Sequence, residues 1–191
     1  MADHRIVSLL PSSTEIAGAL GHGPRLVGRS PECDFPDGLA SLPVCTRAHV
    51  GVGPSRAIDD GVRALVARGL SVYEVDAPLL RELEPTLILT QDACEVCAVS
   101  PKDLTAALAD WIGRPPTLLS LRPSTLGDVW DDIRRVAAAA GVEKAGHRVT
   151  TSLSDRLAAI GERTGALESR PTVACLEWLD PVMGAGHWMP E

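Results

Sequence analysis

The chain opens with a strand, a helix and a second strand in close succession. Residues 5–10 (RIVSLL) form an apolar run of strand length, and residues 25–28 (RLVG) form another. Between them, Ser12 or Ser13 is expected to cap a helix that Gly21 ends. Two strands joined by a helix pair in parallel, because antiparallel neighbours need only a tight turn between them. This unit predicts a parallel sheet covered by helices.

The same alternation of strands and helices continues along the chain. Strands are expected at residues 71–75, 86–90, 117–121 and 171–178, and helices at residues 59–68, 76–84, 103–112 and 124–167. Gly141 and Gly146 could break or bend the last of these helices. The order predicts an α/β fold with a Rossmann-like parallel-sheet N-terminal lobe, a long connecting helix and the start of a second α/β lobe. The expected boundaries are 1–122, 123–168 and 169–191.

Charge and composition exclude several classes of protein. The net charge is −7, and no Lys/Arg run is present, so we expect no binding to nucleic acid or to an anionic membrane surface. The apolar runs are too short for a membrane span or a signal peptide, which predicts a cytoplasmic location for the chain as written. In a reducing compartment, the five cysteines would be free, metal-bound or transiently oxidised.

A Cys-x-x-Cys pair, Cys94 and Cys97, follows the strand expected at 86–90. Its loop would lie at the carboxyl end of a parallel strand, where ligands of open α/β sheets usually bind. The pair supplies half of a tetrahedral zinc or iron site, and it could also cycle as a redox pair or simply pack in the protein. Further ligands could come from the loop after the second strand, which carries Cys33, Cys45 and His49.

Near the end of the chain, a glycine-containing segment precedes a histidine and a tryptophan. Trp178 ends the strand expected at 171–178, and the run Gly-Ala-Gly then leads to His187 and Trp188. Beside a tetrapyrrole or corrin, the imidazole could bind the metal and the indole could stack. The alternative is a loop anchor that packs on the next element. On the long helix, a cluster of charges is expected to form a solvated face: Asp131, Asp132, Arg134 and Arg135.

Three ordered segments resemble one protein family. They are SLLPSSTEI, LLRELEPTLILTQ and EWLDPVMGAGHWMPE. Together they resemble the class III periplasmic binding proteins of ABC importers, most of all the cobalamin-binding branch. The resemblance covers most of the chain, although Thr86 stands where an Asp is more usual and most of the second lobe would lie beyond residue 191.

The resemblance implies a binding protein without catalytic turnover. Its ligand would be a small metal chelate, such as cobalamin, haem or a ferric siderophore, held between two lobes joined by a rigid helix. It also implies that Glu15 presents a carboxylate to the arginines of an ABC permease. The residues expected to line the cleft are Ser12, Ser13, Cys33, Gln91, Cys94, Cys97, Trp178, His187 and Trp188.

A second hypothesis is a cytoplasmic metal- or thiol-dependent enzyme on the same scaffold. It would use Cys33, Cys94 and Cys97, and it is favoured by the absence of an export signal in the sequence as written. A third interpretation is a fragment whose native reading frame continues into further strands and helices.

Overall fold

The computed structural model describes residues 4–92, 99 and 101–184. Its main sheet has four parallel strands in the order β2-β1-β5-β6. These strands are β1 (Ile6–Ser8), β2 (Leu26–Arg29), β5 (Leu87–Gln91) and β6 (Thr117–Leu121). Because β1 and β5 lie in the middle of the sheet, every residue of both strands is buried, including the polar Ser8, Thr90 and Gln91. The predicted α/β fold with a parallel sheet is confirmed.

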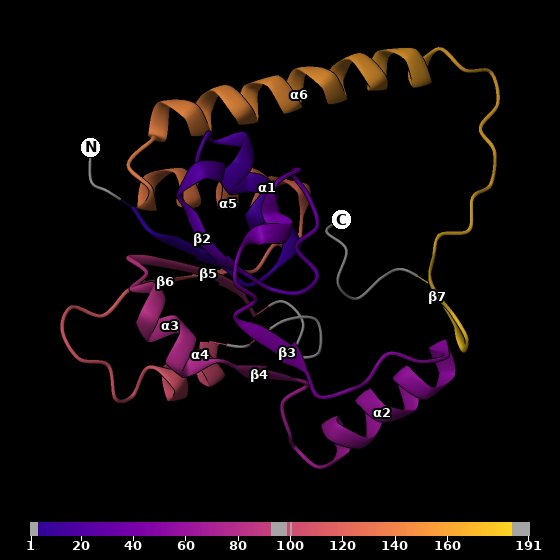
Figure 1. Cartoon of the computed structure of the whole chain (residues 1–191). Helices are drawn as coiled ribbons and strands as arrows, with labels where there is room; N and C mark the ends of the chain where they lie inside the picture. The colour runs from indigo at the N-terminus through magenta and orange to yellow at the C-terminus, as the bar shows by residue number, and fades with distance from the viewer. Residues whose placement is uncertain (1–3, 93–98, 100, 185–191) are drawn as a thin grey trace.

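Helices cover both faces of the sheet (Figure 1). One face carries α1 (Pro11–Ala19) and α5 (Leu126–Ala139), and the other carries α3 (Ala77–Leu83) and α4 (Pro101–Ala107). Successive strand residues alternate between the two cores, because side chains along a strand point to opposite faces. Leu87 and Leu89 pack towards α1 and α5, whereas Ile88 packs towards α3 and α4.

The helical region predicted at 124–167 consists of two helices rather than one. α5 begins with a capping box between Thr125 and Asp128, and it ends before Gly141, whose φ is 66°. The chain then reverses into α6 (Glu143–Gly165), which lies over α5 (Figure 1). The two helices pack closely because Gly146 has no side chain: a Cβ there would lie 2.6 Å from the Cβ of Ala137.

A small antiparallel pair lies beside the main sheet. It joins β3 (Thr46–Ala48) to β4 (Tyr73–Val75), so the strand predicted at 71–75 exists but belongs outside the parallel sheet. β3 lies within a stretch predicted to be a plain connection. Between β3 and β4, α2 (Ser55–Ala67) lies at the periphery and has no fully buried residue. Two short 3-10 helices complete this half of the chain, Gly23–Arg25 and Leu39–Ser41.

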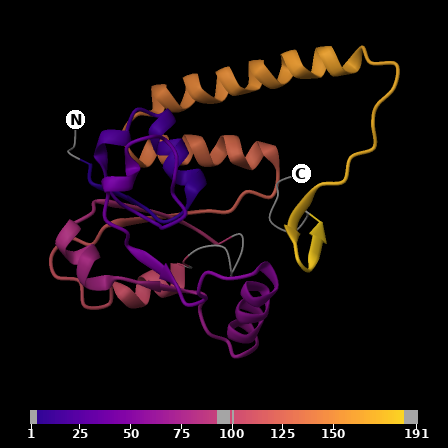
Figure 2. The same cartoon turned by 45° about the vertical axis from the view of Figure 1, so that its right-hand side comes forward.

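After α6, an exposed stretch leads to a hairpin of β7 (Leu176–Leu179) and β8 (Val182–Gly184). β7 begins later than the strand predicted at 171–178. Figure 2 shows the hairpin beside α2, and an ion pair of 2.5 Å joins Arg56 of α2 to Asp180 of the hairpin turn. Within the described ranges, none of the helices is both long and apolar enough to cross a membrane.

Candidate functional site

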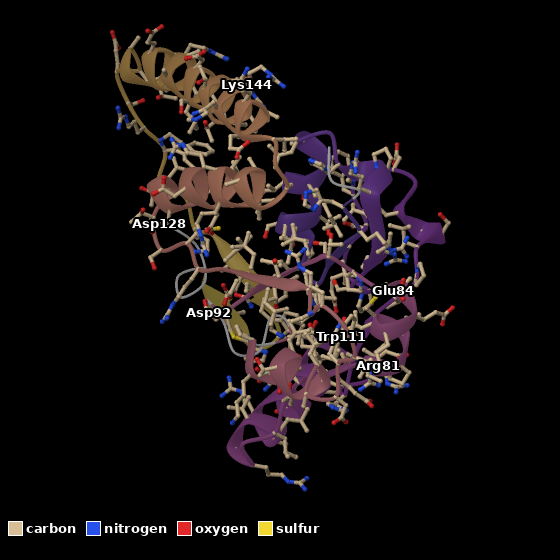
Figure 3. The ribbon with its side chains drawn as sticks, turned by 90° about the vertical axis from the view of Figure 1, so that its left-hand side faces the viewer. Arg81, Glu84, Asp92, Trp111, Asp128 and Lys144 are labelled. Carbon is tan, nitrogen blue, oxygen red and sulfur yellow. The ribbon has the colours of Figure 1, made fainter. Side chains whose placement is uncertain are left out.

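The carboxyl ends of the four parallel strands form one edge of the main sheet. Asp92 follows β5, whereas Glu84 precedes it, and Figure 3 shows these two residues towards opposite sides of the molecule. Asp128, near the start of α5, lies on the side of Asp92. Ligands of open α/β sheets bind at the carboxyl edge, so the loops that leave the strands there form the candidate site.

Near this edge, side chains from the first turn of α1 and from the loop after β2 contact one another in a buried cluster of hydroxyl groups and one thiol, which we call the hydroxyl–thiol cluster. Its members are Ser8, Ser13, Thr14, Ser30 and Cys33, and each is at most 1% exposed. Ser8 Oγ lies 2.6 Å from Ser13 Oγ and 2.7 Å from Thr14 Oγ1. The thiol of Cys33 lies 3.0 Å from Thr14 Oγ1 and 3.3 Å from Ser30 Oγ. The cluster therefore joins β1, α1 and the loop after β2 by short polar contacts.

This burial changes the roles expected for three residues of the segment. Ser13 and Cys33 have no exposed surface for a ligand, whereas Ser12 is exposed in the first turn of α1. The expected capping by Ser12 or Ser13 is wrong: the N-cap is Leu10, with no side-chain cap. The hydroxyl of Ser13 donates instead to the Leu10 carbonyl and contacts Ser8.

Arg29, the last residue of β2, organises the loop that follows. Its Nε donates to the Leu39 carbonyl at 3.0 Å. Its Nη1 lies within hydrogen-bond distance of three more carbonyls, those of Ser30 (3.0 Å), Pro31 (3.4 Å) and Cys33 (3.3 Å). A guanidinium is a planar cation with five N–H donors, so it can hold several carbonyls at once.

The same loop is also held from β4. The hydroxyl of Tyr73 donates to Glu32 Oε1 at 3.3 Å. Burial, followed by the neighbouring Glu32 carboxylate, raises the pKa of Tyr73 to about 12. The phenol is therefore neutral at physiological pH and remains a donor to Glu32.

The other predicted cleft residues lie at different depths. Gln91 ends β5 at the carboxyl edge and is 6% exposed. Trp178 is half-buried in β7, and its indole Nε1 donates to the Asp180 carbonyl at 2.8 Å. Four predicted residues lie outside the described part of the chain: Cys94, Cys97, His187 and Trp188.

The described residues do not complete a metal site. Cys45 is fully buried, and burial raises the pKa of its thiol to about 11, whereas His49 is exposed. Within residues 4–92, 99 and 101–184, no group of three or more His, Cys, Asp or Glu side chains could hold a metal ion. Because Cys33 is buried and hydrogen-bonded, it is also poorly placed as the nucleophile of a thiol-dependent enzyme. The site expected at Cys94 and Cys97 stays a prediction.

An ion pair beside β6 joins a buried carboxylate to an exposed guanidinium, and the sequence did not predict it. Asp132 was expected to be solvated, but it is 5% exposed and accepts a 2.6 Å hydrogen bond from Arg135. Burial raises the pKa of Asp132, although Arg135 and the backbone amide of Arg122 oppose the shift. Arg135 also donates to the Ser120 carbonyl at 2.8 Å, which connects α5 to the sheet. Helical spacing gave the signal, because Asp132 lies four residues before the buried Val136.

No protein-family model matches the chain, and no curated protein matches its sequence. Solved structures do match. The periplasmic heme-binding protein RhuT from Roseiflexus sp. RS-1 is 25% identical, with a TM-score of 0.62 over 91% of this chain and 54% of that protein. The periplasmic vitamin B12-binding protein BtuF of Vibrio cholerae is 20% identical, with a TM-score of 0.64 over 94% and 57%.

The heme-binding protein HutB of Vibrio cholerae is 21% identical and has a TM-score of 0.63 over 92% of this chain and 55% of that protein. The chain therefore spans little more than half the length of these neighbours. All three are described as periplasmic, which gives no support to the expected cytoplasmic location. The chain has the fold of the class III substrate-binding proteins of ABC importers, the family that its sequence motifs resemble.

Proposed function

We propose that this chain binds a metal chelate, a corrinoid or a haem-like molecule, at the carboxyl edge of its main sheet. The observation that carries the proposal is the fold it shares with heme- and vitamin B12-binding proteins over more than nine-tenths of its length. The candidate site supports it, because the polar loops of the chain gather at the edge where α/β sheets bind ligands. Its role would be that of the binding component of an ABC-type uptake system, or of a relative of one.

The proposed cleft lies between two lobes, the first ending near residue 122 and the second beginning after residue 168. Ser12 and Gln91 would contribute from the first lobe, and Trp178 from the start of the second. We retain Cys94, Cys97, His187 and Trp188 as proposed contacts. Ser13 and Cys33 are proposed to support the cleft instead of touching the ligand.

The proposed macromolecular partner is an ABC permease. Glu15 is exposed on α1, so its carboxylate is available to a basic partner surface. It lies one helical turn after Ser12, in the middle of α1. A permease contact at Glu15 would therefore lie close to the bound ligand.

Titration of the whole chain with cyanocobalamin, hemin and a ferric siderophore tests the proposal. Each ligand absorbs visible light, so binding can be followed both by ligand absorbance and by calorimetry. We expect one of them to bind with a micromolar or lower dissociation constant, a range that matches a specific small-molecule site. Absence of binding to all three would refute the proposed function.

A matched pair of variants locates the site. Ser12→Phe adds a ring at the carboxyl edge, whereas Ala19→Phe adds one at the other end of the same helix, also at an exposed position. We expect Ser12→Phe to weaken binding at least about tenfold, because a bulky group would occupy ligand space. Ala19→Phe should bind like the wild type, and equal effects of the two variants would place the ligand elsewhere.

A further inference from the structure

The loop after β2 is held from two sides. We call residues 30–42 the rim loop. From within the loop, four carbonyl oxygens converge on Arg29, those of Ser30, Pro31, Cys33 and Leu39. Hydrogen bonds from a charged donor are stronger than neutral ones, and removing the donor leaves the acceptors unpaired. Arg29 therefore stabilises the path of the loop as a bound cation would.

On the buried side of the rim loop, the hydroxyl–thiol cluster connects the loop to α1. Thr14 of α1 contacts Ser8 of β1 and Cys33 of the rim loop through one hydroxyl oxygen. The cluster is buried and its members contact one another, so displacing one of them leaves a partner unsatisfied in the interior. The first turn of α1, with the exposed Ser12, is thereby fixed relative to the rim loop.

We propose that Arg29 and Cys33 are positioning residues for ligand binding. They hold the rim loop and the first turn of α1 in one relative placement at the carboxyl edge, and neither of them touches the ligand. This inference rests on the proposed function only for its effect on affinity, since its effect on the loop can be measured in the ligand-free protein. It gives the thiol of Cys33 a hydrogen-bonding role in place of metal binding or nucleophilic attack.

Amide hydrogen exchange of the ligand-free chain tests the structural part. Two rim-loop amides report on the loop, those of Cys33 and Leu42, which donate to Ser30 and Leu39. In Arg29→Met we expect both to exchange at least about tenfold faster, because several charge-assisted hydrogen bonds are lost. The amide of Leu9, bonded to the Leu89 carbonyl in the sheet, should keep its rate.

Arg63→Met is the matched control, because Arg63 is an exposed arginine paired with Asp59 within α2. It should leave all three amides unchanged. Rim-loop exchange in Arg29→Met within about twofold of the wild type would overturn the proposal, as that change is smaller than the loss of one hydrogen bond.

Two substitutions of Cys33 test the effect on binding, with cyanocobalamin and hemin as the probes. Cys33→Ser keeps a group that can hydrogen-bond to Thr14 and Ser30, whereas Cys33→Ala removes it. We expect Cys33→Ala to weaken the affinity about tenfold and Cys33→Ser to restore most of it, since one buried polar contact is at stake. Equal affinities for both variants and the wild type would overturn the proposal.

The two arms separate this inference from the proposed function. If the wild type binds neither probe, the proposed function fails for both ligand classes, and the exchange rates alone decide the role of Arg29. If the wild type binds and Arg29→Met exchanges faster without any loss of affinity, the rim loop does not position the site and the inference fails.

Discussion

We predict that burial of the His22 imidazole makes the stability of this protein depend on pH. His22 lies between α1 and β2, is 6% exposed, and has no hydrogen-bond partner at either ring nitrogen among the described residues. Its ring centroid lies 6.4 Å from that of His4. Burial first, then the positive charge of Arg25 and the neighbouring His4, lower the pKa of His22 below its ordinary value of 6.5. Folding therefore disfavours the protonated form of His22.

The sign and size of the effect follow from linkage. Below the ordinary pKa, the unfolded chain takes up a proton at His22 that the folded protein resists, so the free energy of unfolding falls with falling pH. The slope cannot exceed about 1.4 kcal/mol per pH unit for one group. If the folded protein binds no proton there, the loss at about pH 5.5 reaches about 1.4 kcal/mol relative to about pH 8.

Urea unfolding of the wild type and of His22→Leu, followed by circular dichroism between about pH 8 and about pH 5.5, measures this effect. The variant cannot be protonated at residue 22, so its stability relative to the wild type should rise as the pH falls, by up to about 1.4 kcal/mol. His147→Leu, at an exposed position on α6, is the control and should show a constant difference. A constant difference for His22→Leu as well would refute the reasoning.

Two further predictions concern the helices and the hairpin. Gly146→Ala should lower the free energy of unfolding measured in urea by about 1–3 kcal/mol, because the new Cβ would lie 2.6 Å from that of Ala137. Gly161→Ala on the same helix meets no atom within 4 Å and should raise that free energy by up to about 1 kcal/mol. Equal effects would contradict the close packing of α5 and α6. Arg56→Glu or Asp180→Arg alone should speed amide exchange in β7 and β8 by up to about fivefold, the effect expected from the loss of an exposed ion pair. The double charge reversal should restore the wild-type exchange rates, and failure to do so would contradict the ion pair.

Much of the main sheet could be predicted from the sequence. β5 begins with a continuous apolar run at residues 87–89, which follows Pro85 and Thr86 and is typical of a strand buried on both faces. The start of α5 was also predictable, because Thr125 carries a local capping signal. Such features depend on a few neighbouring residues and survive into the folded structure.

Features that depend on distant residues were harder to predict. Ser12 and Ser13 both suit an N-cap, but the buried neighbours of Ser13 engage its hydroxyl, and Leu10 precedes Pro11 at the helix start. The chain reverses direction at Gly141, and α6 packs closely on α5 because Gly146 faces α5. The hydrophobic periodicity of the sequence does not predict that contact. Asp132 was expected among solvated charges, but packing places it on the buried side of α5, where Arg135 hydrogen-bonds one of its carboxylate oxygens.

The candidate site shows the same division. Its place at the carboxyl edge follows from the parallel sheet, which the sequence predicted correctly. Which side chains are exposed at that edge depends on tertiary packing, so Ser12 and Ser13 have opposite exposures despite being neighbours. The site expected at Cys94 and Cys97 lies outside the described residues and stays a prediction.

The most direct test of the central claim is a map of ligand protection by amide hydrogen exchange. The whole chain would be compared with and without saturating cyanocobalamin or hemin, whichever binds. We predict slower exchange at the carboxyl edge, in the first turn of α1, after β5 and in β7, with no change at Gly21 and Glu84 on the amino edge. Protection confined to the amino edge, or no protection by either ligand, would contradict a chelate site at the carboxyl ends of the strands.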